Sequence, residues 1–361
     1  MTTKIEWTDE TFNPIRARNR ATGKVGWHCE HVTPGCEHCY SETMNRQLGT
    51  GLPFKLGHRE DIELFLDEKT LMRPLRWKRP RKIFVCSMTD LFADFVPDDW
   101  IDKIFAVMAL CPQHSFQVLT KRPERMRQYM TEDGIGRVGY AESLAKRMLR
   151  ERSGRDDPVL IGKTLRWPLS NVWLGASIED QKRADERIPH LLNTPAAVRF
   201  LSCEPLLGPI DLDHLWTPTH RFSALIGQTC ERVPAGTLGS KNGLRVIDPF
   251  GPRLDWIIVG GESGPRARPM HPDWARSIRD QCQAAGVAFF FKQWGEWCRF
   301  ENHHYFVSAW RKRWANVSPT GEVEYDPCGI SDFDPDAMIR VGKRTAGRQL
   351  DGRTWNEYPD G

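Results

Sequence analysis

The sequence predicts an α/β protein, built as a partial or complete (β/α) TIM-type barrel of six to seven βα units with insertions. Two observations lead to this prediction: short continuous apolar runs recur along the chain, and helical patterns lie between them. Continuous apolar runs suit strands of a parallel sheet that is buried on both faces. A flat doubly wound sheet is the alternative, and the number of units favours the barrel.

Seven segments have the length and composition of the predicted strands. The first lies within residues 6–15, which contain Trp7, Phe12 and Ile15. Each of the others is short and is followed by polar or turn-forming residues, as expected of a buried strand. These are the apolar runs 83–85, 116–119, 172–174, 198–201, 256–259 and 287–291.

Helical patterns of apolar residues separate several of these strands. One helix is predicted after Pro97, because Ile101, Ile104, Phe105 and Met108 fall at positions i, i+3, i+4 and i+7. Two more amphipathic patterns, in residues 184–192 and 274–282, predict helices of the same kind. Strands that alternate with helices in this way indicate an α/β domain.

Two insertions and an extension interrupt the alternation. Residues 131–170 carry a basic helical stretch, residues 142–152. Residues 214–253 are rich in Gly, Pro and Thr and are predicted to form a long loop or a small insertion. We therefore predict one barrel domain over residues 1–297 and a C-terminal extension over residues 298–361.

Composition narrows the class of protein. The 361 residues are 40% hydrophobic and 27% charged, and no apolar run is long enough to cross a bilayer. The polar N-terminal segment does not resemble a secretory signal, so we expect a cytoplasmic protein with no membrane partner. The formal net charge of +4 permits a nucleic-acid partner without indicating one.

The sharpest chemical signal lies in residues 27–40, which we call the cysteine loop. Cys29, Cys36 and Cys39 have the spacing C-x6-C-x2-C between Gly and Pro residues, and a helix is predicted directly after them. Three thiolates in one loop can hold a metal or a [4Fe–4S] cluster that keeps one iron open. The cysteines in apolar patterns are instead predicted to be small core residues: Cys86, Cys111, Cys203 and Cys282.

Structural zinc is the alternative occupant of the cysteine loop. His28, His31 or His38 would complete a four-ligand site with the three cysteines. Structural zinc sites more often take paired ligands from two separated arms, and the sequence offers no second arm of this kind. A zinc-stabilised nucleic-acid-binding protein is the competing hypothesis.

Polar side chains follow the predicted strands, where barrel enzymes carry their active sites. Glu204, Glu262 and Lys292 each directly follow an apolar run, and buried ionisable groups need partners. We predict them as catalytic residues in a polar cavity at one rim, onto which the cysteine loop opens. For some strand-end residues a helix cap is an equally simple explanation. The residues predicted to bind a cofactor are Tyr40, Ser87, Asp90, Lys121, Ser177 and Glu179.

The segment Cys36–Tyr40 resembles the end of the radical S-adenosylmethionine signature, with His38 at the usual aromatic position. The wider pattern is similar to an uncharacterised radical-SAM-like family found in phages and prophages. Its first cysteine spacing is six residues, where the commonest signature has three. The similar segments are residues 5–8, 12–14, 34–40, 87–92, 119–123, 201–206, 260–264 and 291–295.

This resemblance implies a partial TIM-type barrel with an iron–sulfur cluster at its top. Cys29, Cys36 and Cys39 would bind three irons, and the fourth iron would chelate S-adenosylmethionine. Reductive cleavage of this cofactor would give a 5′-deoxyadenosyl radical that abstracts hydrogen from a substrate. An electron donor such as a flavodoxin or ferredoxin is implied as a partner.

Nucleic acid is one candidate substrate, because basic residues gather at three places in the sequence. These are residues 73–82, which include Trp77, residues 121–127, and residues 16–20 before the cysteine loop. Acidic residues are almost as numerous as basic ones, 47 against 51, so solvated basic surfaces are the competing explanation. Peptides and small molecules fit the pattern equally well.

Overall fold

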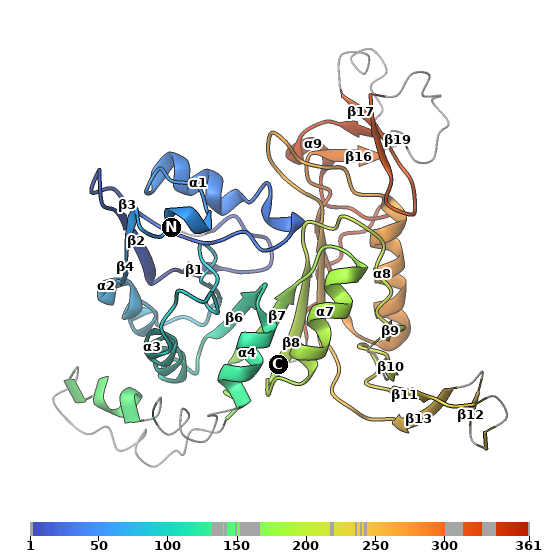
Figure 1. The fold of residues 1–361 in the computed structure, drawn as a ribbon, viewed down its shortest axis with the longest axis horizontal. Helices are drawn as coiled ribbons and strands as arrows, with labels where there is room; N and C mark the ends of the chain where they lie inside the picture. Colours follow the sequence, from blue (N-terminus) through green and yellow to red (C-terminus); the bar gives the residue numbers. More distant parts are fainter. Residues whose placement is uncertain are drawn as a thin grey trace. The chain divides into compact units, whose positions relative to one another are not determined.

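The computed structural model describes residues 3–131, 140, 143–148, 150–151, 167–216, 220–234, 237–238, 240–241, 244–299, 313–326 and 337–359. The chain divides into two compact units, which are coloured along the sequence in Figure 1. The N-terminal unit comprises Met1–Ala176 and Asn193–Arg199. The C-terminal unit comprises Ser177–Leu192 and Phe200–Gly361.

Parallel strands form the centre of the N-terminal unit. They are β1 (Glu10–Phe12), β5 (Lys82–Val85), β6 (Ser115–Thr120) and β7 (Val172–Ser177), and they pair in that order. Two helices follow β5 and β6, namely α3 (Asp98–Ala109) and α4 (Pro123–Thr131). The residues predicted to form the apolar face of α3 are buried, because that spacing places them on one side of the helix.

The C-terminal unit repeats the alternation. Its parallel strands are β8 (Val198–Cys203), β14 (Trp256–Gly260) and β15 (Ala288–Gln293), paired in that order. Its helices are α7 (Gln181–Leu192) and α8 (Pro272–Ala285). The sequence sets both ends of α8: the His271 ring accepts a hydrogen bond from the Asp273 N–H, and Gly286 ends the helix at φ +67°.

The mixed α/β class with parallel strands is therefore confirmed in the described part of the chain. Each segment that predicted a strand overlaps one of the seven parallel strands, and the three predicted amphipathic helices are α3, α7 and α8. Of the predicted basic helix, residues 143–148 are helical, while most of the rest of residues 131–170 lies outside the described residues. None of the described helices is long and apolar enough to span a membrane.

The two faces of the parallel strands differ in the C-terminal unit. Helix α8 contacts β14 and β15 and covers one face, where the thiols of Cys203 and Cys282 interact. Phe200, Trp256 and Phe290 lie on the other face, and their ring centroids are 5.7 and 6.1 Å apart in that order. Because side chains alternate along a strand, Ser202 and Glu204, which lie two and four positions after Phe200, continue this second face.

Antiparallel sheets supplement the parallel strands. The N-terminal unit contains β2 (Ile15–Asn19), β3 (Val25–Gly26) and β4 (Ile62–Leu66), ordered β3-β2-β4, together with α1 (Tyr40–Leu48) and α2 (Glu68–Leu71). The predicted insertion at 214–253 forms a sheet of β9 (Leu215–Trp216), β10 (His220–Phe222), β11 (Thr229–Arg232), β12 (Ser240–Lys241) and β13 (Leu244–Asp248). The extension contains β16 (Trp297–Arg299), β17 (Trp314–Val317), β18 (Val323–Tyr325), β19 (Ala337–Arg340) and α9 (Lys343–Ala346).

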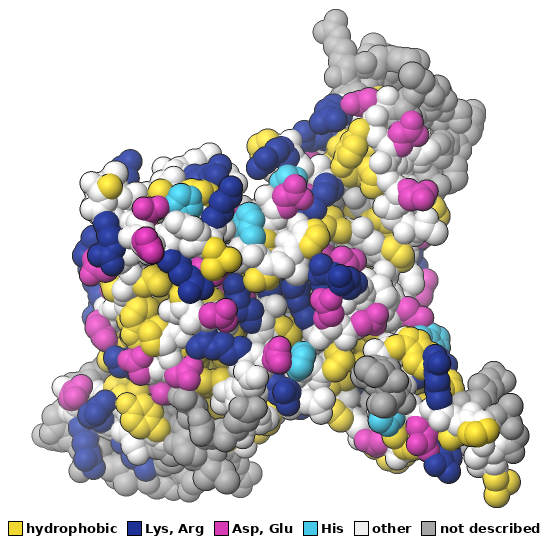
Figure 2. Space-filling view, viewed as in Figure 1, with side chains coloured by type: hydrophobic (Ala, Val, Ile, Leu, Met, Phe, Trp, Pro, Cys, Tyr) yellow, Lys and Arg dark blue, Asp and Glu magenta, His cyan; other side chains and the backbone are white. Residues whose placement is uncertain are grey.

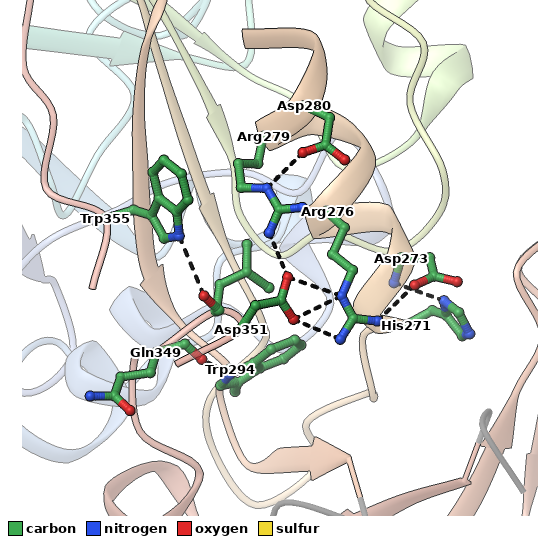
Figure 3. Close-up of polar contacts among 10 residues, drawn as sticks. His271, Asp273, Arg276, Arg279, Asp280, Trp294, Gln349, Asp351 and Trp355 are labelled. Atoms are coloured by element: carbon green, nitrogen blue, oxygen red, sulfur yellow. Dashed lines mark hydrogen bonds and ion pairs between the residues drawn. The ribbon is translucent and has the colours of Figure 1, made fainter. Parts of the chain in front are cut away.

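The last described residues return to the C-terminal unit and lie against β15. The Phe291 N–H donates to the carbonyl oxygen of Trp355 at 3.1 Å. Asp351 binds Arg276 and Arg279 of α8, as the dashed lines in Figure 3 show. These contacts hold the chain end against an edge strand that would otherwise expose unpaired backbone groups. The predicted domain boundary after residue 297 stays a prediction.

Candidate functional site

Both ends of the cysteine loop are fastened to the segment that follows β5. At the start of the loop, the Thr89 hydroxyl donates to the carbonyl oxygen of His28 at 2.9 Å. At its end, the hydroxyls of Tyr40 and Ser41 each donate to the carbonyl oxygen of Ser87 at 3.0 Å. The loop therefore begins and ends at the carboxyl end of a parallel strand, which is where α/β proteins bind ligands.

Asp90 joins this segment to the end of β6 and to the loop. Its carboxylate accepts hydrogen bonds from the Thr120 hydroxyl at 2.7 Å, the Lys121 N–H at 2.9 Å and the Arg122 guanidinium at 3.1 Å. Arg122 also donates to the carbonyl oxygen of Glu30 at 3.4 Å. The carboxylate is buried and occupied by these donors, so in this conformation Asp90 positions the loop.

Two of the three loop thiols are close enough to influence each other. Burial, the Asp90 charge and the Cys39 thiol raise the pKa of Cys29 to about 12, and the Arg122 guanidinium acts in the opposite direction. Cys36 is buried, and its carbonyl oxygen accepts the Cys39 N–H at 3.2 Å. Among the described residues, no three His, Cys, Asp or Glu side chains are arranged as a metal-binding group.

A fourth cysteine lies beside the thiols of the cysteine loop. Cys86 is buried, as predicted, but its thiol also interacts with Cys29 and Asp90, and burial raises its pKa. Its φ of +55° is in the left-handed region, which is strained for a residue with a side chain. No separate sequence signal predicts this placement, because the apolar residues before Cys86 are equally typical of a core position.

The three histidines of the loop have different surroundings. His28 is buried with its Nε2 3.4 Å from Glu30, and burial lowers its pKa although Glu30 opposes this shift. His31 contacts the Glu42 carboxylate at 2.6 Å. The Nδ1 atom of His38 is buried and has no hydrogen-bond partner in the described part of the chain. His38 thus has a buried ring nitrogen without a hydrogen-bond partner among the described residues.

In the C-terminal unit, Glu204 and Lys292 form an ion pair at the carboxyl ends of β8 and β15. Their charged atoms are 2.9 Å apart, and the Ser202 hydroxyl donates to Glu204 at 3.1 Å. A Cβ atom at Gly260, on the intervening strand, would lie 2.6 Å from the Glu204 Oε1 atom. Gly260 therefore leaves the space that the Glu204 carboxylate occupies. The pair lies on the face opposite α8, and the side chains of Glu204 and Lys292 are 13% and 17% exposed.

The other predicted catalytic residue, Glu262, is held by its own loop. Arg268 donates to its carboxylate from the backbone N–H at 2.8 Å, from Nε at 2.9 Å and from Nη2 at 2.6 Å. Glu262 is buried, and these three bonds fix the chain between the two residues. The contacts assign Glu262 a positioning task, and its catalytic role stays a prediction.

Two predicted cofactor-binding residues share one arginine. Arg187 of α7 donates to the Ser177 carbonyl oxygen at 2.6 Å and lies 3.3 Å from the Glu179 carboxylate. Glu179 is fully buried. A buried carboxylate needs such a partner, so the pair explains why a charged residue follows β7. Cofactor contact by Ser177 or Glu179 stays a prediction.

Residues 2–359 match the protein family described as "Protein of unknown function (DUF5131)". The chain belongs to the DUF5131 family. No curated protein and no solved structure matches it. The DUF5131 match extends over both compact units, so the cysteine loop and the strand-end residues all fall inside the family region.

Proposed function

We propose that this DUF5131 protein is a radical S-adenosylmethionine enzyme that holds a [4Fe–4S] cluster through Cys29, Cys36 and Cys39 in a partial TIM-type barrel. The attachment of both loop ends to the carboxyl end of β5 is the observation that supports this most strongly. This attachment holds the loop that carries the three thiols at the edge of the sheet where parallel α/β proteins bind cofactors.

The donor set fits this cluster in its chemistry, because cysteine thiolates are the usual ligands of iron–sulfur clusters. In the described conformation the thiols are not grouped as metal ligands, and burial favours the protonated form of Cys29. Loading therefore requires loss of thiol protons and a closer approach of the three sulfurs. When bound, the cluster with S-adenosylmethionine would supply one-electron reductive cleavage of the sulfonium and hydrogen abstraction from a substrate.

The chain's own residues have separate tasks in this proposal. Thr89 and Ser87 anchor the loop ends, and Arg122 offers a positive charge that favours the Cys29 thiolate. We propose that Glu204 and Lys292 are the residues that contact substrate or cofactor. An electron donor such as a flavodoxin or ferredoxin is the proposed partner.

Metal and sulfide analysis on protein purified without oxygen tests the proposal. We expect brown protein that contains iron and sulfide and that cleaves S-adenosylmethionine after chemical reduction. Cys36→Ala should lose iron and sulfide together. The matched control is Cys230→Ala, a half-buried cysteine of β11 outside the loop, which should keep both. Wild-type protein without iron and sulfide under these conditions would exclude the cluster.

One observation supports a second candidate, a zinc-stabilised nucleic-acid-binding protein. The buried Nδ1 of His38 has no partner among the described residues, and an imidazole nitrogen with three thiolates makes a common zinc site. This candidate predicts colourless protein with one zinc and no sulfide. His38→Ala should then reduce the zinc content, whereas it should leave an iron–sulfur cluster in place.

A further inference from the structure

The structure separates the three basic groups of the sequence by what their side chains contact. In residues 121–127 and 16–20, three of the seven cations pair with nearby carboxylates, so part of their charge is neutralised within the fold. The pairs are Arg122 with Asp90, Arg125 with Asp98 and Arg18 with Glu63, at 3.1, 2.9 and 2.8 Å.

Residues 73–82, which we call the basic segment, carry the most cations of the three groups. They contain six Lys and Arg residues and no acidic residue. Arg76, Lys78 and Arg79 are exposed, and none of the three side chains makes an ion pair or hydrogen bond with the described part of the chain. These three positive charges, which lie within four sequence positions, therefore face solvent without an acidic partner in the described part of the chain.

Trp77 fixes two further cations at the same place. The guanidinium groups of Arg73 and Arg81 lie over its ring at 5.0 and 5.2 Å from the centroid. Both arginines share one carboxylate, that of buried Glu10, at 3.5 and 3.1 Å. The basic segment therefore keeps a net positive charge, and part of it is held in a defined arrangement.

The surface charge is mixed on one face of the molecule. On the face shown in Figure 2, Lys and Arg side chains lie interspersed with Asp and Glu. This agrees with a formal net charge of only +4. A cation-rich stretch without acidic neighbours in sequence is consequently a local feature, and its charge is not a by-product of a strongly basic protein.

We propose that the basic segment binds the phosphate backbone of a nucleic acid. Four of its six cations are arginines, whose planar guanidinium groups match phosphate oxygens. None of the large hydrophobic side chains that are exposed in the described part of the chain belongs to this segment, and such side chains would be needed for insertion into a lipid surface. A polymeric phosphate is therefore the better match.

This surface is separate from the cysteine loop. The basic segment ends at the start of β5, whereas the loop is fastened beyond its end, and the four residues of β5 span about 13 Å. The inference extends the proposed function by naming a nucleic acid as partner. It does not depend on the cluster, because phosphate binding by these side chains needs no metal.

Salt-dependent binding of a labelled single strand and a labelled short duplex, followed by fluorescence anisotropy, tests the inference. We expect log K to fall linearly with log salt between about 50 and 200 mM. The variant Arg76→Ala/Lys78→Ala/Arg79→Ala should weaken binding and reduce the slope by roughly 0.9 for each lost duplex phosphate contact, so by up to about 2.7.

The matched control removes the same charge elsewhere, at three exposed cations: Lys24→Ala/Lys55→Ala/Arg344→Ala. It should keep most of the wild-type slope. Equal losses in both triple variants, no binding at low salt, or preferential binding to anionic vesicles would overturn the inference. Iron and sulfide content of both variants should equal that of wild type, so failure here is distinguishable from failure of the cluster proposal.

Discussion

At the scale of single residues, the described contacts divide the predicted site into groups that position and groups that remain reachable. Asp90 and Glu262 are buried and occupied by donors from neighbouring residues. Glu204 and Lys292 pair with each other and keep partial exposure. The latter two are therefore the better candidates for contact with a ligand.

Asp90→Asn tests the positioning task. The change keeps the shape but removes the charge that pairs with Arg122, and it places an amide opposite N–H donors. We expect a loss of about 1–3 kcal/mol in the free energy of unfolding, measured by urea denaturation. Asp94→Asn, at an exposed site in the same segment after β5, should change the free energy of unfolding far less. Equal stability of Asp90→Asn and wild type would contradict this role.

Gly260→Ala tests the space that Glu204 uses. An added Cβ would meet Glu204 Oε1 at 2.6 Å, so the carboxylate must move away from its present contact with Lys292. A double-mutant cycle with Glu204→Gln and Lys292→Met, measured by the free energy of unfolding, should give a coupling energy of about 0.5–3 kcal/mol in the wild-type background. The same cycle in the Gly260→Ala background should give a value near zero. An unchanged coupling would show that the pair tolerates the methyl group.

At the scale of elements, the parallel strands were predictable and the short antiparallel sheets were not. A strand buried on both faces is a continuous apolar run, which is visible without knowledge of its partners. Strand β2 instead alternates Ile15, Ala17 and Asn19 inward with Arg16 and Arg18 outward. That alternation was hidden in an arginine-rich stretch, and its partner β4 lies more than forty residues later.

The candidate site was predictable in residue type and only partly in arrangement. Polar residues at strand ends drew attention to Asp90 in the N-terminal unit and to Glu204 and Lys292 in the C-terminal unit, and their functional roles stay predictions. The proximity of Cys86 to Cys29 and the space left by Gly260 depend on tertiary contacts. A glycine after a strand is explained equally well by a tight turn, so its packing role carried no separate signal.

The attachment of the chain end to α8 should depend on pH. Hydrogen bonds from Arg276 and Arg279 hold the pKa of Asp351 below its ordinary value of 3.8. Because the folded-state pKa is the lower one, this stabilisation is present above the ordinary carboxyl pKa and is lost as pH falls through the folded-state value.

Asp351→Asn should therefore lower the melting temperature at neutral pH, and the difference from wild type should shrink in acid. Asparagine tolerates the φ of +52° at this position, so the comparison isolates the charge. Asp273→Asn, which removes a more exposed partner of Arg276, serves as the control and should have the smaller effect. A difference that stays constant down to the acid limit would contradict the ion-pair explanation.

At the scale of the whole molecule, the central proposal is that the cysteine loop, anchored at the carboxyl end of β5, holds an iron–sulfur cluster. The most direct measurement is the iron, sulfide and zinc content per chain of anaerobically purified wild type beside Cys36→Ala. We expect about four irons and four sulfides in the wild type and neither in the variant. Stoichiometric zinc without sulfide, or equal iron and sulfide in both proteins, would contradict the claim.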